Sequence, residues 1–321
     1  MVVTKVERIL VIKLSALGDF VLALAAMKHI RLAHPGAQIT LLTTPPFEAL
    51  AKSCPFVDAV ETDGKPEGFA EWMALRQRLK AARYDRVYDL QTSSASARIF
   101  YSLWPFPPQW SGNAWGCALP HANRRRDFMH TLERQADQLK YAGIWPNAPI
   151  EPGAAPPPDL SWVPAATESR RTKPYAMLIP GGSAHRLDKR WPAERFGELA
   201  KLLTARGFDI VIIGGPQESA LARAIQRYVG TARDLTGRTD FAKVAAMGAR
   251  AALVIGNDTG PLHLAAAAGA PTIVLFSQAS NPNLSAPRGH VTVLQAENLQ
   301  DLTVAQVAQA TYALTGEHAP S

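Results

Sequence analysis

Residues 256–263, Gly-Asn-Asp-Thr-Gly-Pro-Leu-His, combine residue types that can bind a phosphorylated ligand. They follow an apolar run, and their proline suits the first position of a helix, where its missing amide hydrogen is harmless. The free amides and partial positive charge of a helix start favour a diphosphate. Asp258, Thr259, Gly260 and His263 are therefore candidate ligand-binding residues. The alternative is that Asp258 or Thr259 only caps the helix and that His263 packs in the interior.

Two further loops carry glycines and charged groups suited to the same ligand. Residues 180–183, Pro-Gly-Gly-Ser, end a strand, and the glycines let a ligand approach the backbone beside Ser183. Lys189, in the run Asp-Lys-Arg-Trp-Pro, could neutralise phosphate oxygens, and a solvated basic pair beside a packed tryptophan is the alternative. Glu218 follows the next strand, where a carboxylate can accept hydrogen bonds from ribose hydroxyls or simply open a helix.

Asp19 is the candidate for proton transfer. It ends the run Ser-Ala-Leu-Gly-Asp, residues 15–19, between a strand and a helix. A carboxylate in that place could take a proton from an attacking hydroxyl group. An acid that only favours the helix start is an equally good account.

Several well-known binding motifs are absent from the sequence. There is no Gly-x-Gly-x-x-Gly, which weakens a nicotinamide-binding interpretation, and no Gly-x-x-x-x-Gly-Lys-Ser/Thr, which excludes an ordinary phosphate-loop NTPase. No Asp-x-Asp pair is present to hold a magnesium ion on a diphosphate. We therefore expect Lys189 and helix amides to meet the leaving-group charge, with no metal and no cofactor.

The elements that position these loops alternate between strand and helix. Strands are predicted at residues 8–14, 38–43, 59–61, 85–90, 175–179, 209–213, 252–255 and 272–276. Helices are predicted at residues 19–32, 67–82, 128–142, 192–206, 217–228, 241–249, 261–268 and 304–314. This alternation predicts parallel sheets covered by helices, with ligands at the carboxyl ends of the strands.

Proline marks the boundary between two domains. Eight of the 25 prolines fall in residues 145–174, where the alternation stops. Proline lacks an amide donor and fixes φ, so residues 151–174 are the expected linker. The N-terminal domain is then 1–150 and the second domain 175–300. A last helix in 301–321 is expected to pack back on the N-terminal domain.

Composition fits a globular protein of two domains, because 321 residues exceed one core of about 100 to 150. No apolar run approaches the roughly 20 residues of a membrane span, and Lys13 interrupts the first apolar run, so we expect neither a transmembrane helix nor a signal peptide. Only Cys54 and Cys117 are present, outside any metal or disulfide spacing, which favours the cytoplasm. The net charge of +7 divides into +5 before residue 150 and +2 after it. Such an excess favours a polyanion: nucleic acid, anionic lipid or a phosphorylated substrate.

The runs at residues 15–19, 188–192 and 256–263, in this order and spacing, resemble the ADP-heptose:lipopolysaccharide heptosyltransferases, glycosyltransferase family 9. Residues 84–90, Tyr-Asp-Arg-Val-Tyr-Asp-Leu, resemble the family's strand on the acceptor side, so the likeness spans nearly the whole chain. The resemblance implies an α/β fold of GT-B type, with two doubly wound Rossmann-like domains facing a central cleft. The N-terminal domain would bind the acceptor and the C-terminal domain the ADP-heptose donor.

The resemblance also implies roles for individual residues. Asp19 would be the catalytic base, Lys189 would contact the donor phosphates, Glu218 the ribose, and Asp258, Thr259, Gly260 and His263 would line the diphosphate and sugar pocket. The reaction would be a direct, inverting, metal-independent transfer of heptose to the inner core of lipopolysaccharide. Its anionic acceptor lies at the inner membrane, so we expect peripheral association with the cytoplasmic face and no nucleic-acid partner. Gly18 and Arg124, Arg125 and Arg126 are the acceptor-side candidates, and a solvated face is the alternative for these arginines.

One departure from the family keeps alternatives open. Residues 276–280, Phe-Ser-Gln-Ala-Ser, stand where many relatives carry a Gly-Pro-Ser type loop, so a donor with another nucleotide-linked hexose remains an alternative. A non-catalytic, two-lobed nucleotide-sugar binding protein is the second alternative. A nucleotide-sugar epimerase is the third, although the dinucleotide fingerprint that it normally carries is missing.

Overall fold

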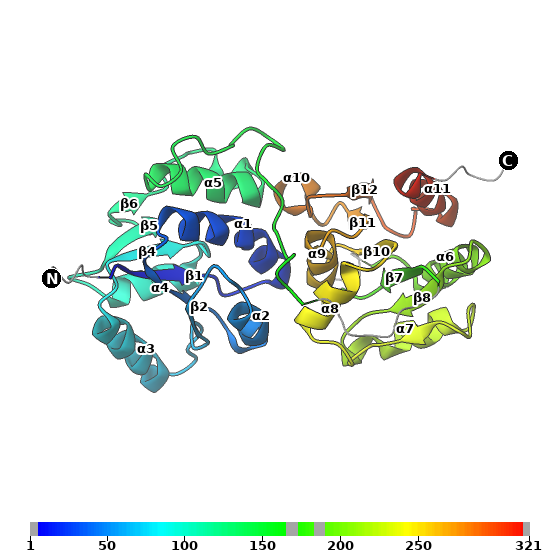
Figure 1. Ribbon diagram of the computed structural model, residues 1–321, viewed down its shortest axis with the longest axis horizontal. Coiled ribbons are helices and arrows are strands. Elements are labelled where there is room, and N and C mark those ends of the chain that lie inside the picture. The colour runs from blue at the N-terminus through cyan, green and yellow to red at the C-terminus, as the bar shows by residue number, and fades with distance from the viewer. Residues whose placement is uncertain (1–5, 165–172, 183–189, 317–321) are drawn as a thin grey trace. The chain divides into compact units, whose positions relative to one another are not determined.

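The computed structural model describes residues 6–164, 173–182 and 190–316. The chain divides into two compact units, Met1–Pro158 and Asp159–Ser321, and we call them unit 1 and unit 2. The division falls inside the proline-rich segment 151–174 that the sequence marks as a linker. Each unit is built on its own six-stranded sheet (Figure 1).

Unit 1 carries a parallel sheet in the order β3-β2-β1-β4-β5-β6. Its strands are β1 (Arg8–Ile12), β2 (Gln38–Leu42), β3 (Ala59–Glu61), β4 (Arg86–Asp89), β5 (Gln109–Gly112) and β6 (Leu119–Pro120). Its helices are α1 (Leu17–Ala33), α2 (Glu48–Lys52), α3 (Phe69–Ala82), α4 (Ser94–Ser102) and α5 (Thr131–Tyr141), with short 3-10 turns η1 (Pro45–Phe47) and η2 (Arg126–Phe128). The central strand β1 pairs with β2 and β4 and is apolar from Ile9 onward because helices cover both of its faces.

The helices of unit 1 form a layer on each face of its sheet. Helices α1 and α5 lie side by side on one face (Figure 1). On the other face α3 and α4 bury Leu75, Leu79, Ile99 and Phe100 against the β1 side chain Leu10. Helices α3 and α4 are also joined by a hydrogen bond of 2.6 Å from Arg76 Nε to the Ser102 carbonyl.

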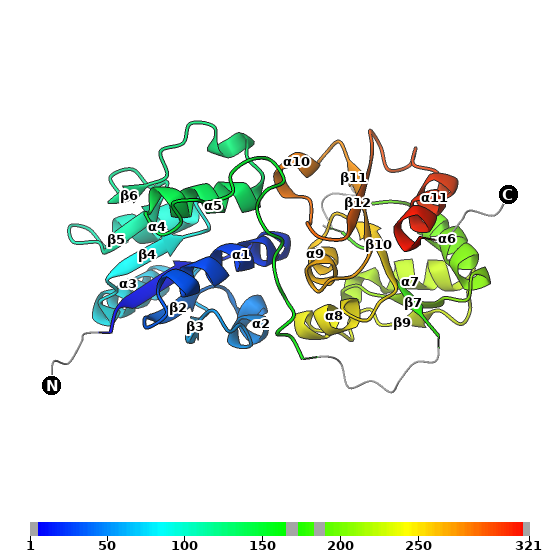
Figure 2. The ribbon, with the colours of Figure 1, turned by 45° about the horizontal axis from the view of Figure 1, so that its top comes forward.

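Unit 2 repeats this architecture with the strand order β12-β11-β10-β7-β8-β9, also parallel. Its strands are β7 (Tyr175–Ile179), β8 (Asp209–Ile212), β9 (Arg233–Asp234), β10 (Leu253–Asn257), β11 (Thr272–Ser277) and β12 (Val291–Ala296). Its helices are α6 (Ala193–Ala205), α7 (Ser219–Gln226), α8 (Phe241–Gly248), α9 (Gly260–Ala267), α10 (Pro282–Ser285) and α11 (Val304–Thr315), with the 3-10 turn η4 (Pro216–Glu218). Helices α8 and α9 pack together (Figure 2), and α6 packs against α7 and α11.

The structure corrects one expectation about the C-terminal helix. We expected residues 301–321 to pack back on the N-terminal domain, but α11 packs on α6 and β11 of unit 2. Its Val307 and Ala308 are buried in the core cluster of unit 2, together with Leu203 of α6 and Leu275 of β11. Apolar residues at helical spacing indicate that a helix has a buried face, but not which sheet covers it.

No helix in the described ranges has both the length and the apolar content needed to cross a membrane.

Candidate active site

Asp19 lies at the carboxyl edge of the unit 1 sheet, in the first turn of α1, the helix that follows β1. Its Oδ2 accepts a hydrogen bond of 3.3 Å from the Ala16 amide, and the residue is partly exposed. Gly18 precedes it in the same turn. The structure therefore places the predicted base where an acid also favours a helix start, so the catalytic role of Asp19 stays a prediction.

Two cations that sequence reasoning missed lie near Asp19. Lys13, at the end of β1, is only 4% exposed, and burial lowers the pKa of its ammonium group to about 8, against the opposing charge of Asp19. Arg134 of α5 also has its pKa lowered by burial, and the Asp19 charge again opposes that shift. Both cations are thus close enough to Asp19 for its charge to influence them. The sequence signal for Lys13 was a charge inside an apolar strand, which is costly to bury without a partner.

Asp89 ends β4 at the same edge of the sheet and is fully buried. Its Oδ1 accepts hydrogen bonds from the amides of Gln91 at 3.0 Å and Thr92 at 2.8 Å, whereas its Oδ2 has no partner. Burial raises the pKa of this carboxyl group to about 6 despite those hydrogen bonds. The Gln91 Oε1 in turn accepts from the Leu14 and Ser15 amides at 2.9 and 3.2 Å, so the loops after β1 and β4 are tied together.

The raised pKa of Asp89 predicts a pH-dependent stability difference between the wild type and Asp89→Asn. Below the unfolded pKa of about 3.8 both states hold the proton, whereas above about 6 the folded chain carries a buried ionised carboxylate. Wild-type stability should therefore fall relative to the variant as the pH rises from 4 to 6, by roughly 3 kcal/mol for a shift of about two units. Urea unfolding of both proteins between pH 4 and 7.5 measures this difference in the free energy of unfolding. A stability difference that does not change with pH would contradict the conclusion that Asp89 is buried with an unpaired oxygen.

The three consecutive arginines after β6 differ in their surroundings. Arg124 and Arg125 are exposed, whereas Arg126 is partly buried. Its Nε donates to His121 Nδ1 at 3.3 Å and its Nη1 lies 3.0 Å from Asp127 Oδ1. Arg126 is therefore held by its neighbours, and only the first two arginines fit the solvated alternative. Contact of any of the three with the acceptor stays a prediction.

Asn257, the last residue of β10, organises the carboxyl edge of the unit 2 sheet. It is fully buried, and its Nδ2 donates to the carbonyls of Pro180 at 2.8 Å and Gly181 at 3.1 Å. Its Oδ1 accepts from the Trp191 amide at 3.0 Å. The loop after β7, the segment before α6 and the loop before α9 are thus joined by one side chain. The sequence contained this asparagine in its strongest motif but gave no reason to assign it that role.

The loop before α9 shows unsatisfied polar atoms. Thr259 is the N-cap residue, yet its side chain makes no capping hydrogen bond, and its Oγ1 is buried without a partner. His263 is 4% exposed, with Nε2 3.4 Å from Asp258 Oδ1 and a buried Nδ1 that has no partner. Gly260 begins the helix. The simple capping alternative therefore fails for Thr259, and both side chains retain hydrogen-bonding capacity.

Both carboxylate oxygens of Glu218 accept hydrogen bonds from the backbone of two loops. Its Oε1 accepts from the Gly182 amide at 3.1 Å and its Oε2 from the Gly215 amide at 2.5 Å, and the residue is 8% exposed. A Cβ atom on Gly181 would lie 2.0 Å from Oε1, so that position has no room for a larger residue. These contacts match the helix-start alternative, and the predicted contact with ribose stays a prediction.

Arg190 is a further residue that sequence reasoning did not select. Its guanidinium donates to the Gly182 carbonyl at 2.6 Å, and its Nε is buried without a partner. Gly182 also lies near Thr259, because a Cβ on this glycine would be 3.8 Å from the threonine Cγ2. Ser183 and Lys189, two predicted donor-binding residues, lie outside the described residues. Trp191 is buried with its Nε1 2.8 Å from the Leu302 carbonyl, so this tryptophan packs on its own unit.

Among the described residues, side chains that bind metals are not grouped at either edge. Within the three described ranges, no group of three or more His, Cys, Asp or Glu side chains is arranged to hold a metal ion. The donor-type atoms that lack partners at the unit 2 edge belong instead to a hydroxyl, an imidazole and a guanidinium. Such groups donate hydrogen bonds to anionic oxygen atoms.

Comparison with known proteins shows which family and which solved structures this chain is similar to. The family described as glycosyltransferase family 9 (heptosyltransferase) matches residues 72–307. Lipopolysaccharide heptosyltransferase 2 of Escherichia coli K12 is 25% identical, over 88% of this chain and 86% of that protein. The structure of E. coli ADP-heptose LPS heptosyltransferase II matches with a TM-score of 0.79 at 23% identity, covering 96% of this chain and 98% of that one. The structure of E. coli heptosyltransferase WaaC with ADP matches with a TM-score of 0.77 at 23% identity, covering 96% of this chain and 99% of that one. The predicted α/β fold of GT-B type is confirmed.

Proposed function

Because this chain belongs to glycosyltransferase family 9, the heptosyltransferases, we propose that it moves heptose from ADP-heptose to the inner core of a lipopolysaccharide precursor. One observation carries the donor half of the proposal. Thr259 Oγ1 and His263 Nδ1, at the start of α9, and Arg190 Nε, in the segment before α6, are buried and unpaired. Buried polar atoms normally find partners, and the diphosphate and sugar of a donor would supply them. Relatives with this fold include one whose structure is described with ADP.

The proposed reaction is a single inverting displacement. An acceptor hydroxyl gives its proton to Asp19 while its oxygen attacks the anomeric carbon of the heptose. The bond between that carbon and the diphosphate oxygen breaks, and ADP leaves with the electron pair. Its negative charge is met by the amides at the start of α9, by Arg190 and by Lys189. No metal takes part in this scheme.

A transfer assay with ADP-heptose and a truncated lipopolysaccharide acceptor tests the proposal. We expect product of inverted anomeric configuration at an unchanged rate in EDTA. Calorimetric titration with ADP, UDP and GDP, without metal, should show a preference for ADP. A preference for UDP would instead support the alternative of another nucleotide-linked hexose. ADP binding without any transfer would support the two-lobed binding protein.

Arg190→Met should weaken ADP binding about 10-fold to 100-fold, because a charge-assisted hydrogen bond contributes about 1.5 to 3 kcal/mol. Arg190→Lys keeps the charge and should therefore lose less affinity for ADP. Arg195 offers a matched control, since its guanidinium donates to the Leu302 carbonyl and not to the Gly182 carbonyl. Calorimetry should therefore give an unchanged Kd for Arg195→Met. Equal affinity for ADP in Arg190→Met and the wild type would remove Arg190 from the donor site.

The proposed acceptor is a lipid, so we also propose that the enzyme works at the cytoplasmic face of the inner membrane as a peripheral protein. The basic excess of the N-terminal half supports attraction to an anionic surface. Binding to anionic vesicles should weaken as salt is raised. Binding that salt does not change would contradict an electrostatic contribution.

A further inference from the structure

The loops that follow α4 and β5 in unit 1 expose large aromatic side chains. Trp104, Phe106 and Trp115 are 48%, 90% and 81% exposed. They belong to one region, because the Trp115 amide donates to Tyr101 Oη at 3.1 Å and the backbone at Gly116 lies beside the Trp104 ring. We call Trp104, Phe106 and Trp115 the aromatic group. Large apolar side chains exposed together mark an interaction surface.

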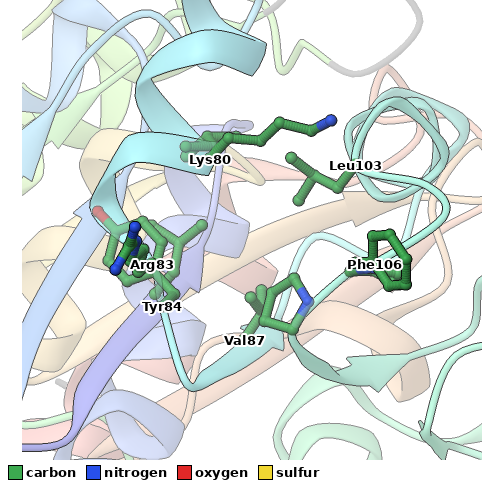
Figure 3. A pocket seen from close by; sticks show the side chains of 10 residues that line it. Lys80, Arg83, Tyr84, Val87, Leu103 and Phe106 are labelled. Carbon is green, nitrogen blue, oxygen red and sulfur yellow. The ribbon is translucent and has the colours of Figure 1, made fainter.

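A cavity of about 210 Å³ lies next to this group, between the end of α3 and the loop that follows α4. Leu79 and Leu103 line its buried part, and Tyr84 and Phe106 line its sides. Lys80 runs above the cavity toward Leu103, while Arg83 and Phe106 stand on opposite sides of it (Figure 3). The cavity is therefore apolar inside with cations at its opening.

The two cations at the cavity have no acidic partner. Neither Lys80 nor Arg83 lies within salt-bridge distance of a carboxylate in the part of the chain that the structure describes. The other arginines of α3 are engaged, since Arg76 donates to the Ser102 carbonyl and Arg78 pairs with Glu61 and Asp63. The free positive charge of α3 is thus concentrated beside the cavity. An apolar cavity with unpaired cations fits an anionic amphiphile.

This surface is separate from the edge that carries Asp19. Tyr84 precedes β4 and Pro108 precedes β5, so the cavity lies at the amino ends of the strands. Helix α3 runs back along the sheet from the carboxyl edge, where its exposed Phe69 and Met73 lie in the first turns. With 14 residues it spans about 21 Å. The layer therefore reaches from the cavity to the level of the carboxyl edge.

We propose that the outer side of the α3 and α4 layer is the surface by which the enzyme docks on an anionic phospholipid bilayer. The aromatic group enters the interfacial region, and one lipid phosphate is held by Lys80 and Arg83 with its upper acyl chain over the cavity. Tryptophan favours that region, and basic side chains bind anionic lipid surfaces. The proposal rests on the proposed lipid-linked acceptor. A layer lying along the bilayer keeps the carboxyl edge beside the membrane, within reach of such an acceptor.

Vesicle co-sedimentation of the full chain tests the proposal, with vesicles of phosphatidylcholine alone or with 30% phosphatidylglycerol. We expect the wild type to bind only the anionic vesicles. The double variant Lys80→Gln, Arg83→Gln should bind them on the order of tenfold to thirtyfold more weakly. Phe106→Ser should also lose binding, because it removes an inserted ring and leaves the charge unchanged.

Matched controls lie on the arginine-rich loop of the same unit. Arg124→Gln, Arg125→Gln removes the same charge from exposed positions, and Phe128→Ser removes a ring that is 83% exposed. These controls should retain most of the binding. The proposal is overturned if they lose binding while the variants at the cavity keep it, or if all variants bind like the wild type. Equal thermal unfolding midpoints establish that each variant is folded.

The two proposals fail in distinguishable ways. Vesicle binding is measured without donor or acceptor, so it does not depend on turnover. A wild-type enzyme that transfers no heptose to a soluble truncated acceptor would contradict the proposed function alone. A wild-type enzyme that transfers heptose but ignores anionic vesicles would contradict the docking surface alone.

Discussion

Asp19→Asn should lower kcat by about 10²-fold to 10⁴-fold, the range that a positioned general base contributes. Asparagine has the same shape and can still accept the hydrogen bond from the Ala16 amide. It cannot take the proton of the acceptor hydroxyl. Affinity for ADP should remain near that of the wild type, because Arg190, Thr259 and His263, the residues proposed to bind the donor, belong to unit 2. Initial rates and calorimetry with ADP measure the two effects separately.

Asp127→Asn is the matched control for this experiment. Asp127 is an exposed carboxylate of unit 1, 3.0 Å from the Arg126 guanidinium, and its replacement changes the net charge by the same amount. Transfer by this variant should stay within a few-fold of the wild type, since an exposed ion pair contributes little. If Asp19→Asn turns over normally, or loses ADP binding as well, Asp19 is not the base.

Asn257→Ala is expected to have the largest effect on unit 2. It removes three hydrogen bonds and leaves the Trp191 amide and the carbonyls of Pro180 and Gly181 unpaired. Each buried group left without a partner costs about 1 to 3 kcal/mol, so we expect a loss of at least about 3 kcal/mol in the free energy of unfolding. Affinity for ADP should fall as well, because the three loops lose their common anchor. Urea unfolding and calorimetry on the folded variant test both expectations.

Asn298→Ala separates this role from the general loss of an asparagine. Asn298 is exposed and accepts one hydrogen bond, at 3.0 Å from the Gln300 amide. Its replacement should change stability by less than about 1 kcal/mol and leave ADP binding intact. Equal unfolding curves for Asn257→Ala and Asn298→Ala would show that the loops at the edge of β10 are held by other contacts.

The longer elements could be predicted from the sequence because their apolar residues are continuous or evenly spaced. Strand β1 and helix α1 were predicted within a few residues, as were β10 and α9. Helix α4, with the sequence Ser-Ala-Ser-Ala-Arg-Ile-Phe-Tyr-Ser, was missed because three of its nine residues are serines, which disfavour helix interiors. The strands β5, β6, β9 and β12 were also missed. β6 and β9 have two residues each and exist only through pairing with a neighbour, which no local pattern encodes.

Part of the candidate site could also be predicted from local sequence. Motifs gave the place of Asp19 after β1 and of Thr259 and His263 around the start of α9, because each lies on its own strand-to-helix connection. They could not show that Arg134 lies near Asp19, because α5 begins more than a hundred residues later and packs there through tertiary contacts. Nor could they show that the Glu218 carboxylate is occupied by two backbone amides.

The anchoring of three loops by Asn257 has an energetic consequence for the donor. A nucleotide arriving at this edge meets backbone that is already fixed at Pro180 and Gly181, so little chain entropy is lost there on association. More of the attraction between protein and diphosphate is then left to act on the charge that builds up as the sugar departs. Loops that are already fixed beside the leaving group would thus increase the rate of transfer more than the affinity for the donor.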